Sequence, residues 1–433
     1  MKKNLVHITL LLLILTVLPT QAQQSPKFSK YFEDATLRVD YLRTGNKHHD
    51  TCTLKNFVLQ NDKMWAGSLT QLLDPIDNGA YRIMVKDAKT GRELYSRCYN
   101  SLFKEYSETA TGKDSIASFE EVMLVPMPKQ AVDICMQKRD KNGKFVTAST
   151  FNYDPKKTPI LEIIGENIPQ RKLLYNGDWH NKIDVVIVAE GYGKNDAEKM
   201  QGDFEKFTSY LLAQEPFASR KSDFNVWGVG VLMQESGVTD PNRGKYVKSA
   251  VGSSYNTFGS DRYLMTTNLF QLHGLLVGVP YDHIIIMANC NTYGGGAIYN
   301  FYAFSAVQEM SMWILPHELG HSIGGLADEY VDDELSYNDI HNDGKEPTEP
   351  NITTLIDFDS KWKSLVPKGT PIPTKPVDGL GKRDNGPIGA YEGAGYQAKG
   401  VYRPCTKCMM RDYAAFCPVC RKRMNEIFDL YIK

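Results

Sequence analysis

The sequence is organised around one stretch, His317-Glu318-Leu319-Gly320-His321-Ser322-Ile323-Gly324-Gly325-Leu326-Ala327-Asp328-Glu329-Tyr330. Residues four apart lie on the same face of a helix, so His317 and His321 can place two imidazole nitrogens on one metal ion. Glu318 then points toward the same opening, where it can take a proton from a metal-activated water. The pattern predicts a helix that carries a metal site.

The residues after the second histidine favour this interpretation over its alternative, a surface helix with two solvated histidines. Gly324 and Gly325 end the helix, because a left-handed turn at a helix C-terminus favours glycine. Asp328 follows within reach as a third ligand, and Glu329 is the alternative third ligand. A zinc ion with three protein ligands keeps a fourth position for water, so the stretch predicts a zinc peptidase.

Two features precede this helix. Ser305, with Gln308 three residues later, predicts a capping-box start for the helix. Further upstream, Gly294-Gly295-Gly296 is followed by an apolar run. This pattern predicts an edge strand that an extended peptide can approach closely, although an ordinary glycine turn is the alternative.

The region before these features alternates between apolar runs and amphipathic segments. Residues 183–188, 225–232 and 283–288 are expected to form strands, while residues 196–212 and 262–273 are expected to form helices. Strands that alternate with helices indicate an α/β domain with a mostly parallel sheet. We place this domain at residues 178–433, after a linker or first strand at residues 156–177.

Residues 25–155 show the pattern of an antiparallel β-sandwich. Leu37, Val39 and Tyr41 alternate with polar residues, which is the period of a half-buried strand. Two hairpins are expected at residues 81–99 and 132–149, each with a turn that contains glycine. The chain is therefore predicted to be an α+β multidomain protein whose first domain is an accessory module.

The N-terminus carries the features of a secretory signal peptide. Lys2 and Lys3 precede an apolar run at residues 8–18, which is too short to span a bilayer, and small residues end at Ala22. We expect cleavage after about Ala22 and a secreted or periplasmic protein without membrane insertion. The net charge of −1 gives no electrostatic reason to expect nucleic acid as a partner. The expected partner is a protein or peptide substrate, and the expected state is a monomer.

Four of the eight cysteines form two CxxC units near the C-terminus, Cys405, Cys408, Cys417 and Cys420. Two such units are typical of a structural zinc site. Their spacing is shorter than that of a zinc ribbon, and an oxidising compartment favours disulfides. The sequence leaves both interpretations open, with a weak preference for disulfides. Met409 or Met410, between the units, can form the apolar floor of the metal site.

The segment from residue 331 to about residue 398 is polar and rich in glycine and proline. So long an irregular segment inside a domain is usually functional, and we expect it to wall a substrate cleft. Its acidic run Asp332-Asp333-Glu334 offers oxygen ligands for a calcium ion, but solvated loop acids are the preferred interpretation.

HExxH followed by a glycine and a third ligand, with a methionine further on, resembles the metzincin pattern. That pattern places the third ligand six residues after the second histidine, where this chain has Ala327, and Asp328 lies one residue further. The longer, carboxylate-ended form resembles the clostridial IgA-peptidase family of metallopeptidases, as do three other blocks: residues 189–192, 391–396 and 402–404. The resemblance covers about residues 175–433. The first domain is similar to the N-terminal domain of Bacteroidetes members.

The resemblance implies a metzincin-like zinc endopeptidase, with His317, His321 and Asp328 as metal ligands and Glu318 as catalytic base. It does not imply cleavage of immunoglobulin A, because substrate choice depends on cleft loops. Tyr413, which follows the methionines, is a candidate for stabilising the oxyanion. Two other functions stay open from the residues alone: a secreted binding or adhesin protein with a structural metal site, and a metallohydrolase of non-peptide bonds.

Overall fold

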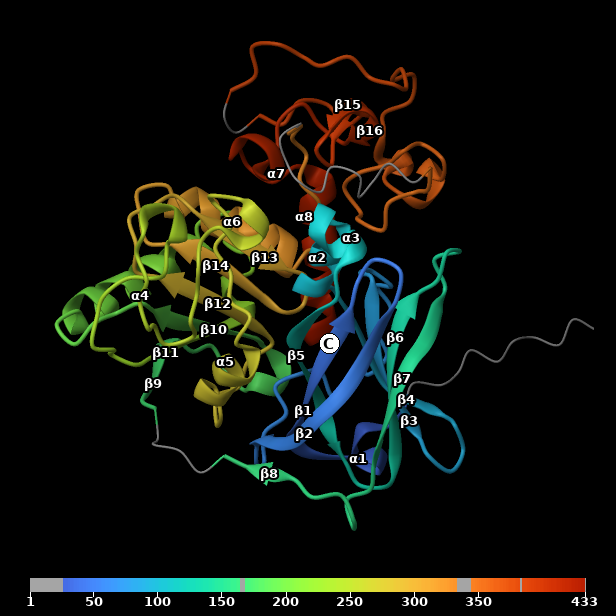
Figure 1. Cartoon of the computed structure of the whole chain (residues 1–433). Coiled ribbons are helices and arrows are strands. Elements are labelled where there is room, and N and C mark those ends of the chain that lie inside the picture. The colour runs from blue at the N-terminus through green and yellow to red at the C-terminus, as the bar shows by residue number, and fades with distance from the viewer. Residues whose placement is uncertain (1–25, 164–167, 333–343, 382–383, 433) are drawn as a thin grey trace, which may run out of the picture.

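The computed structural model describes residues 26–163, 168–332, 344–381 and 384–432. The expected signal peptide, and Asp333 and Glu334 of the acidic run considered for calcium, lie outside these residues. Figure 1 shows a strand-rich N-terminal part beside an α/β part, with the C-terminal segments above both. None of the helices in the described ranges is long and apolar enough to cross a membrane.

The N-terminal part consists of two four-stranded sheets and three short helices. One sheet has the order β5 (Ala117–Pro128), β1 (Phe32–Gly45), β2 (Asp50–Asn61) and β8 (Leu161–Glu162). The other has the order β4 (Glu93–Tyr99), β3 (Tyr81–Asp87), β6 (Val132–Arg139) and β7 (Phe145–Tyr153). The helices are α1 (Phe28–Tyr31), α2 (Leu102–Glu108) and α3 (Ala110–Asp114). Both predicted hairpins are present, β3–β4 and β6–β7.

The two N-terminal sheets pack face to face through aromatic side chains. Tyr41 on β1 lies 6.0 Å, between ring centroids, from Phe151 on β7, and its hydroxyl is 2.8 Å from that of Tyr99 on β4. Such pairs bury large apolar areas and still hold their polar ends in hydrogen bonds. These aromatic residues belong to a hydrophobic cluster that continues onto β10 and β12 of the α/β part.

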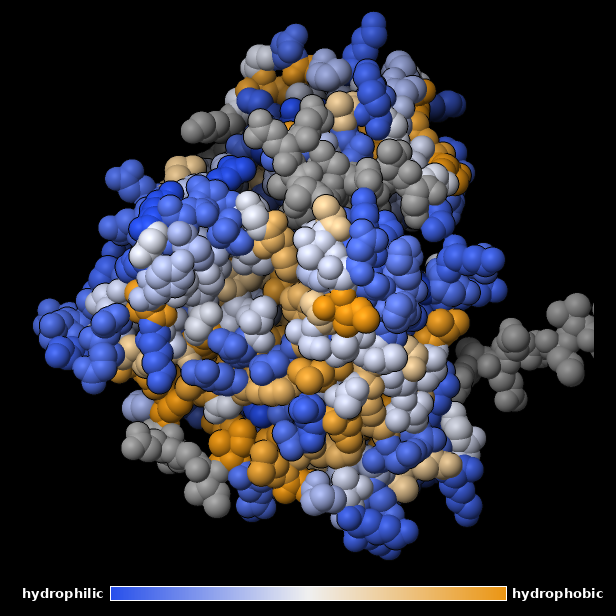
Figure 2. Space-filling view, viewed as in Figure 1, coloured by the Kyte–Doolittle hydropathy of each residue, from blue (hydrophilic) through white to orange (hydrophobic). Residues whose placement is uncertain are grey.

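The prediction that β1 is only half buried was wrong, because its polar face is also covered. Arg38 and Asp40 are buried and form an ion pair of 2.7 Å. Arg38 also donates to Gln60, whose side-chain amide donates to the backbone carbonyl of His273 in α5 (Leu269–Leu275), 2.9 Å away. Figure 2 shows apolar residues gathered in the lower middle of this face, around the region where β1, β2 and α5 meet in Figure 1. The two parts thus share a buried boundary.

The α/β part is built on a six-stranded sheet. Its order is β13 (Gly295–Ile298), β14 (Tyr302–Ala306), β12 (His283–Ala288), β10 (Ile183–Glu190), β11 (Phe224–Gly230) and β9 (Gln170–Leu174). The four central strands are parallel, and the two edge strands, β13 and β9, are antiparallel to them. The predicted mostly parallel sheet is confirmed. Of residues 156–177, β8 joins the N-terminal sheet and β9 joins this one.

Two helix predictions were inaccurate and one was close. The helix α4 (Ala197–Leu211) agrees with its prediction, whereas α5 begins seven residues later than predicted. The cause is Met265, whose backbone exchanges hydrogen bonds of 2.9 and 3.1 Å with Ser254 and so holds the preceding residues extended. The helix α6 (Ser311–Ser322) begins six residues after the predicted cap at Ser305, which lies in β14.

The C-terminal segments pack against the sheet and α6. They comprise a hairpin of β15 (Tyr391–Ala394) and β16 (Gln397–Arg403), then α7 (Met409–Asp412) and α8 (Pro418–Ile432). On α8, Phe428 packs on Phe217 and Phe224, with ring centroids 5.3 and 5.1 Å away. At the far end of α8, Tyr431 accepts a hydrogen bond from Arg97 of β4. The last helix thus joins the α/β part to the N-terminal part.

Candidate metal centre and active site

The helix α6 and the turn after it bring the predicted ligands together. His317 and His321 are one turn apart on α6, and Gly325 then adopts a left-handed conformation with φ of 58°. The backbone of Leu326 donates to the carbonyl of Gly320 over 3.1 Å, which closes the helix end. This turn reverses the chain so that Asp328 faces the two histidines. The glycine-terminated helix end predicted from the sequence is confirmed at Gly325.

The three side chains form a compact triangle. The Nε2 atoms of His317 and His321 are 3.2 Å apart, and they lie 3.0 and 3.3 Å from Oδ1 of Asp328. Nitrogen and oxygen ligands at ~2.0–2.1 Å from a tetrahedral zinc ion are about 3.3 Å from one another. The triangle therefore has the size of a zinc ligand set.

The hydrogen bonds behind the triangle fix which atoms face its centre. Nδ1 of His317 lies 3.0 Å from the carbonyl oxygen of Met409, and Nδ1 of His321 lies 2.7 Å from that of Leu326. A carbonyl oxygen only accepts, so each Nδ1 carries a proton, and once Nε2 is deprotonated its lone pair points inward. Among the described residues, the buried Oδ1 of Asp328 has no partner other than the two Nε2 atoms that face it. Three lone pairs that converge in this way fit a cation.

Protons compete with a metal for this cluster. Burial lowers the pKa of His321, but the charge of Asp328 outweighs it and raises this pKa to about 9. The pKa of His317 is raised as well, because its hydrogen bond with Asp328 outweighs the effect of burial. Burial raises the pKa of Asp328, but the two histidines lower it by more, so the net shift is downward. A metal must displace these protons, so its affinity falls with falling pH.

Glu318 lies on the side of α6 that faces the edge strand β13. A Cβ atom placed on Gly295 would be 2.8 Å from Oε1 of Glu318, so only glycine leaves room for the carboxylate here. Burial raises the pKa of Glu318, and the two histidines offset part of that rise. A carboxylate with a raised pKa beside a set of candidate metal ligands is suited to exchange protons.

The two methionines after α6 have different roles. Met409 supplies the carbonyl oxygen that orients His317. The sulfur of Met410 lies against Gly320, between the two histidines on α6, only 2.4 Å from where a Cβ atom on that glycine would be. Both residues are fully buried. Met410 therefore forms the apolar floor beneath the helix, while Met409 acts through its backbone.

Sequence reasoning did not assign roles to Tyr396, Asn351 and Tyr293, which contact the cluster or its neighbours. The hydroxyl of Tyr396 donates to Oδ2 of Asp328, and Asn351 holds Ala327 by hydrogen bonds of 2.8 and 2.9 Å. The hydroxyls of Tyr293 and Tyr413 are hydrogen-bonded to each other, and the Tyr413 ring lies 5.6 Å, between centroids, from that of His317. Tyr396 lies in the block of residues 391–396 that supported the family resemblance, and this block was the signal in the sequence that could have identified Tyr396.

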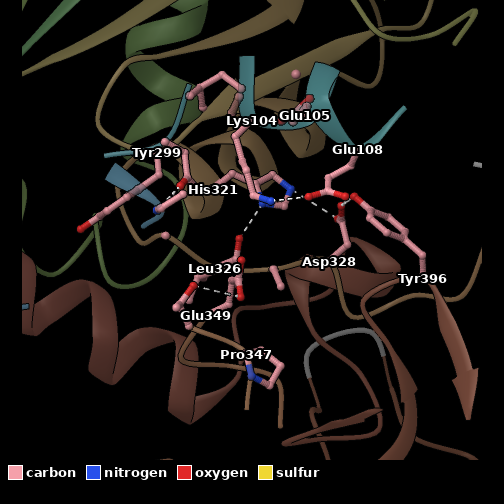
Figure 3. Close-up of a pocket in the computed structure, with 18 of the residues that line it drawn as sticks. Lys104, Glu105, Glu108, Tyr299, His321, Leu326, Asp328, Pro347, Glu349 and Tyr396 are labelled. Atoms are coloured by element: carbon pink, nitrogen blue, oxygen red, sulfur yellow. Dashed lines mark hydrogen bonds and ion pairs between the residues drawn. The ribbon is translucent and has the colours of Figure 1, made fainter. Parts of the chain in front are cut away.

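The cluster opens into a cleft of about 1090 Å³. Its lining includes all of β13, residues 345–349 of the C-terminal region, and α2 of the N-terminal part. Figure 3 shows Lys104, Glu105 and Glu108 of α2 on one side of His321 and Asp328, with Pro347 and Glu349 on the other side. The N-terminal part therefore contributes directly to the wall of the cleft.

The four C-terminal cysteines do not form the expected arrangement. All eight cysteines lie in the described part of the chain, and all are thiols. Cys408, Cys417 and Cys420 gather with Glu329, whereas Cys405 lies outside this group. The preference for disulfides was wrong: the Sγ atoms of Cys408 and Cys420 are 3.7 Å apart, whereas a disulfide requires about 2.05 Å. Glu329 therefore lies in this second group, and Asp328 lies with the two histidines.

A buried HExxH helix, a carboxylate returned to it by a glycine turn, and an adjoining cleft together have the architecture of a metal-dependent hydrolase site. The model of the IgA Peptidase M64 family matches residues 172–385 and 378–428, and that of the Peptidase M64 N-terminus matches residues 27–150. The chain belongs to the IgA Peptidase M64 family, whose members are metal-dependent peptidases. No curated protein matches the chain.

Proposed function

We propose that this chain is an exported zinc endopeptidase that hydrolyses peptide bonds of protein substrates. The observation that carries the proposal is the convergence of three lone pairs, from His317, His321 and Asp328, beside the carboxyl group of Glu318. Two imidazoles and one carboxylate form a ligand set that suits zinc and leaves a position for water. A zinc ion bound there supplies a Lewis acid that acidifies the water and polarises the scissile carbonyl.

Glu318 is the proton carrier in this proposal. Its carboxylate accepts a proton from the attacking water and later donates it to the amine that leaves. Its position against Gly295 places it next to the strand along which the substrate backbone would lie. A hydroxyl of the Tyr293–Tyr413 pair, next to His317, is the proposed donor to the developing oxyanion.

The edge strand β13 is the proposed binding site for the substrate backbone. All four residues of β13 line the cleft, and an extended peptide can add to a sheet edge by main-chain hydrogen bonds. Part of this edge is already used, since the backbone of Gly295 is hydrogen-bonded to Arg262 and Leu264. The substrate is therefore expected to pair with the remainder of β13.

The test is a proteome-wide profile of cleavage sites for the wild-type chain and Glu318→Gln, with metal analysis of both. We expect wild type to cleave peptide bonds and Glu318→Gln to keep its zinc while losing ~10²–10⁴-fold in turnover. Undiminished cleavage by Glu318→Gln would refute the assignment of the base. Release of acyl or other non-peptide groups without any peptide cleavage would refute the proposed reaction class.

A further inference from the structure

A second group of metal-binding side chains lies behind the first. Cys408, Cys417, Cys420 and Glu329 each offer a ligand atom, and these four atoms all lie within 4.8 Å of one another. All four residues are buried. The Sγ atom of Cys420 is 3.7 Å from that of Cys408 and 3.5 Å from that of Cys417. Thiolates bound at ~2.3 Å to one tetrahedral ion are about 3.8 Å apart, so these sulfurs have the spacing of shared ligands.

The state of Glu329 is an independent sign that a cation belongs here. Its side chain is completely buried, and Oε1 accepts from Asn351 over 2.9 Å and from the Cys420 thiol over 3.4 Å. Oε2 is buried and has no hydrogen-bond partner in the described chain. A buried carboxylate oxygen without a partner is costly unless a positive charge compensates it.

We propose that Cys408, Cys417, Cys420 and Glu329 bind a structural zinc ion. Three thiolates select a borderline-soft metal and disfavour calcium or magnesium. Four protein ligands complete a tetrahedral shell and leave no position for water, which distinguishes a structural site from a catalytic one. The site does not depend on the proposed peptidase reaction, since none of its ligands belongs to the histidine cluster.

The ion would join two regions that are distant in sequence, Glu329 and the segment from Cys408 to Cys420. It holds Glu329 to the segment of Cys408 and to the start of α8. The backbone of Glu329 also donates to the carbonyl of Met410 over 2.8 Å, and the neighbouring carbonyl of Met409 orients His317. Arg411 adds a bond of 3.0 Å to the carbonyl of Glu329. The second ion is thus placed to fix the floor of the first site.

The test is elemental analysis of the full-length chain purified without chelators. We expect two zinc ions per wild-type chain and one in the double variant His317→Ala, His321→Ala. Cys417→Ser and Glu329→Gln should each lose the second ion. Cys405→Ala is the matched control, because Cys405 is equally buried nearby but lies outside the group, and it should keep both ions. Equal metal loss in Cys405→Ala and Cys417→Ser, or one ion in wild type and none in the histidine variant, would overturn the proposal.

Two further measurements apply even if a cysteine variant does not fold. Wild type denatured without reductant should show all eight cysteines as free thiols once the metal is removed; a Cys408–Cys420 or Cys417–Cys420 disulfide would overturn the proposal. Cobalt exchanged into wild type and into the histidine double variant should give the intense near-ultraviolet band of sulfur-to-cobalt charge transfer in both. A chain that holds cobalt without this band would exclude thiolate ligands.

Discussion

Asp328 and Glu329 are adjacent in sequence, yet their side chains enter two different clusters. Oδ1 of Asp328 lies 3.0 Å from Nε2 of His317, whereas Oε1 of Glu329 lies 3.4 Å from Sγ of Cys420. Neighbouring side chains of an extended segment point to opposite sides, which is the physical basis of this division. The segment is held in place by Asn351, which bonds Ala327 and Glu329.

Asp328→Ala should lose the metal of the histidine cluster. The two remaining imidazoles bind zinc more weakly than three ligands do. We therefore expect zinc affinity to fall at least 100-fold and peptidase activity to be lost. Equilibrium dialysis against zinc and a peptide-cleavage assay measure the two effects. Asp359→Ala, at an exposed carboxylate, is the control and should behave as wild type. Full zinc binding by Asp328→Ala would exclude this residue as a ligand.

Gly295→Ala should lower turnover without removing metal. The added Cβ would lie 2.8 Å from Oε1 of Glu318 and 2.9 Å from Cγ2 of Ile314, so the carboxylate must move. A displacement of about 1 Å at a catalytic group can reduce rate about 100-fold. Steady-state kinetics and zinc content check this prediction. Gly274→Ala, where a Cβ meets nothing within 4 Å, serves as control. A variant of Gly295 with unchanged kcat would show that Glu318 does not need its present position.

Tyr413→Phe should lower kcat about 10²-fold and leave KM nearly unchanged. A hydroxyl that donates to the oxyanion acts mainly in the transition state, so its loss appears in kcat rather than in substrate binding. Tyr293→Phe removes the hydroxyl that is hydrogen-bonded to Tyr413 and should have a smaller effect. If Tyr293→Phe has the larger effect on kcat, then Tyr293 and not Tyr413 donates to the oxyanion. If neither changes kcat, the oxyanion donor lies elsewhere.

The carboxyl group of Glu105 should make the free energy of unfolding depend on pH between about 4.5 and 7. Burial is the main cause that raises the pKa of this half-buried carboxyl to about 7 from an ordinary value of 4.5, while the hydrogen bond from Tyr263 opposes the rise. A raised folded-state pKa gives stability that is complete below the ordinary pKa and is lost as pH rises through 7. Glu105→Gln should therefore match wild type at low pH and exceed it above pH 7, by about 1–2 kcal/mol.

Thermal unfolding followed across this pH range measures the effect. Glu108, on the same helix, provides a control of opposite sign, because its interactions with Lys104 and Lys47 outweigh burial and lower its pKa. Its contribution to stability is present above the ordinary pKa and is lost as pH falls through the lowered folded-state value. Glu108→Gln should thus be less stable than wild type at neutral pH. Parallel pH profiles for wild type and Glu105→Gln would contradict the prediction.

Local patterns were enough to predict the histidine cluster and the parallel sheet. The spacing of His317 and His321 fixes their common face, and the apolar runs of β10 and β12 identify buried strands. The helix start at Ser305 failed because this residue pairs with Gly295 and Met287 in the sheet, which outweighs a local capping signal. The burial of Arg38 and Asp40 depends on α5, more than 200 residues away. The grouping of Glu329 with Cys420, 91 residues apart, is likewise a property of the tertiary fold.

The carbonyl oxygen of Met409 accepts a hydrogen bond from His317, and that of Met410 accepts one from the backbone of Glu329. These two contacts have a consequence for biosynthesis. A ribosome releases the HExxH helix about ninety residues before these carbonyls, and the cysteines at positions 417 and 420 emerge later still. A growing or prematurely ended chain therefore has both histidines but lacks the carbonyl that orients His317. The candidate metal site can therefore be completed only after the segment that contains Met409 and Met410 has been synthesised.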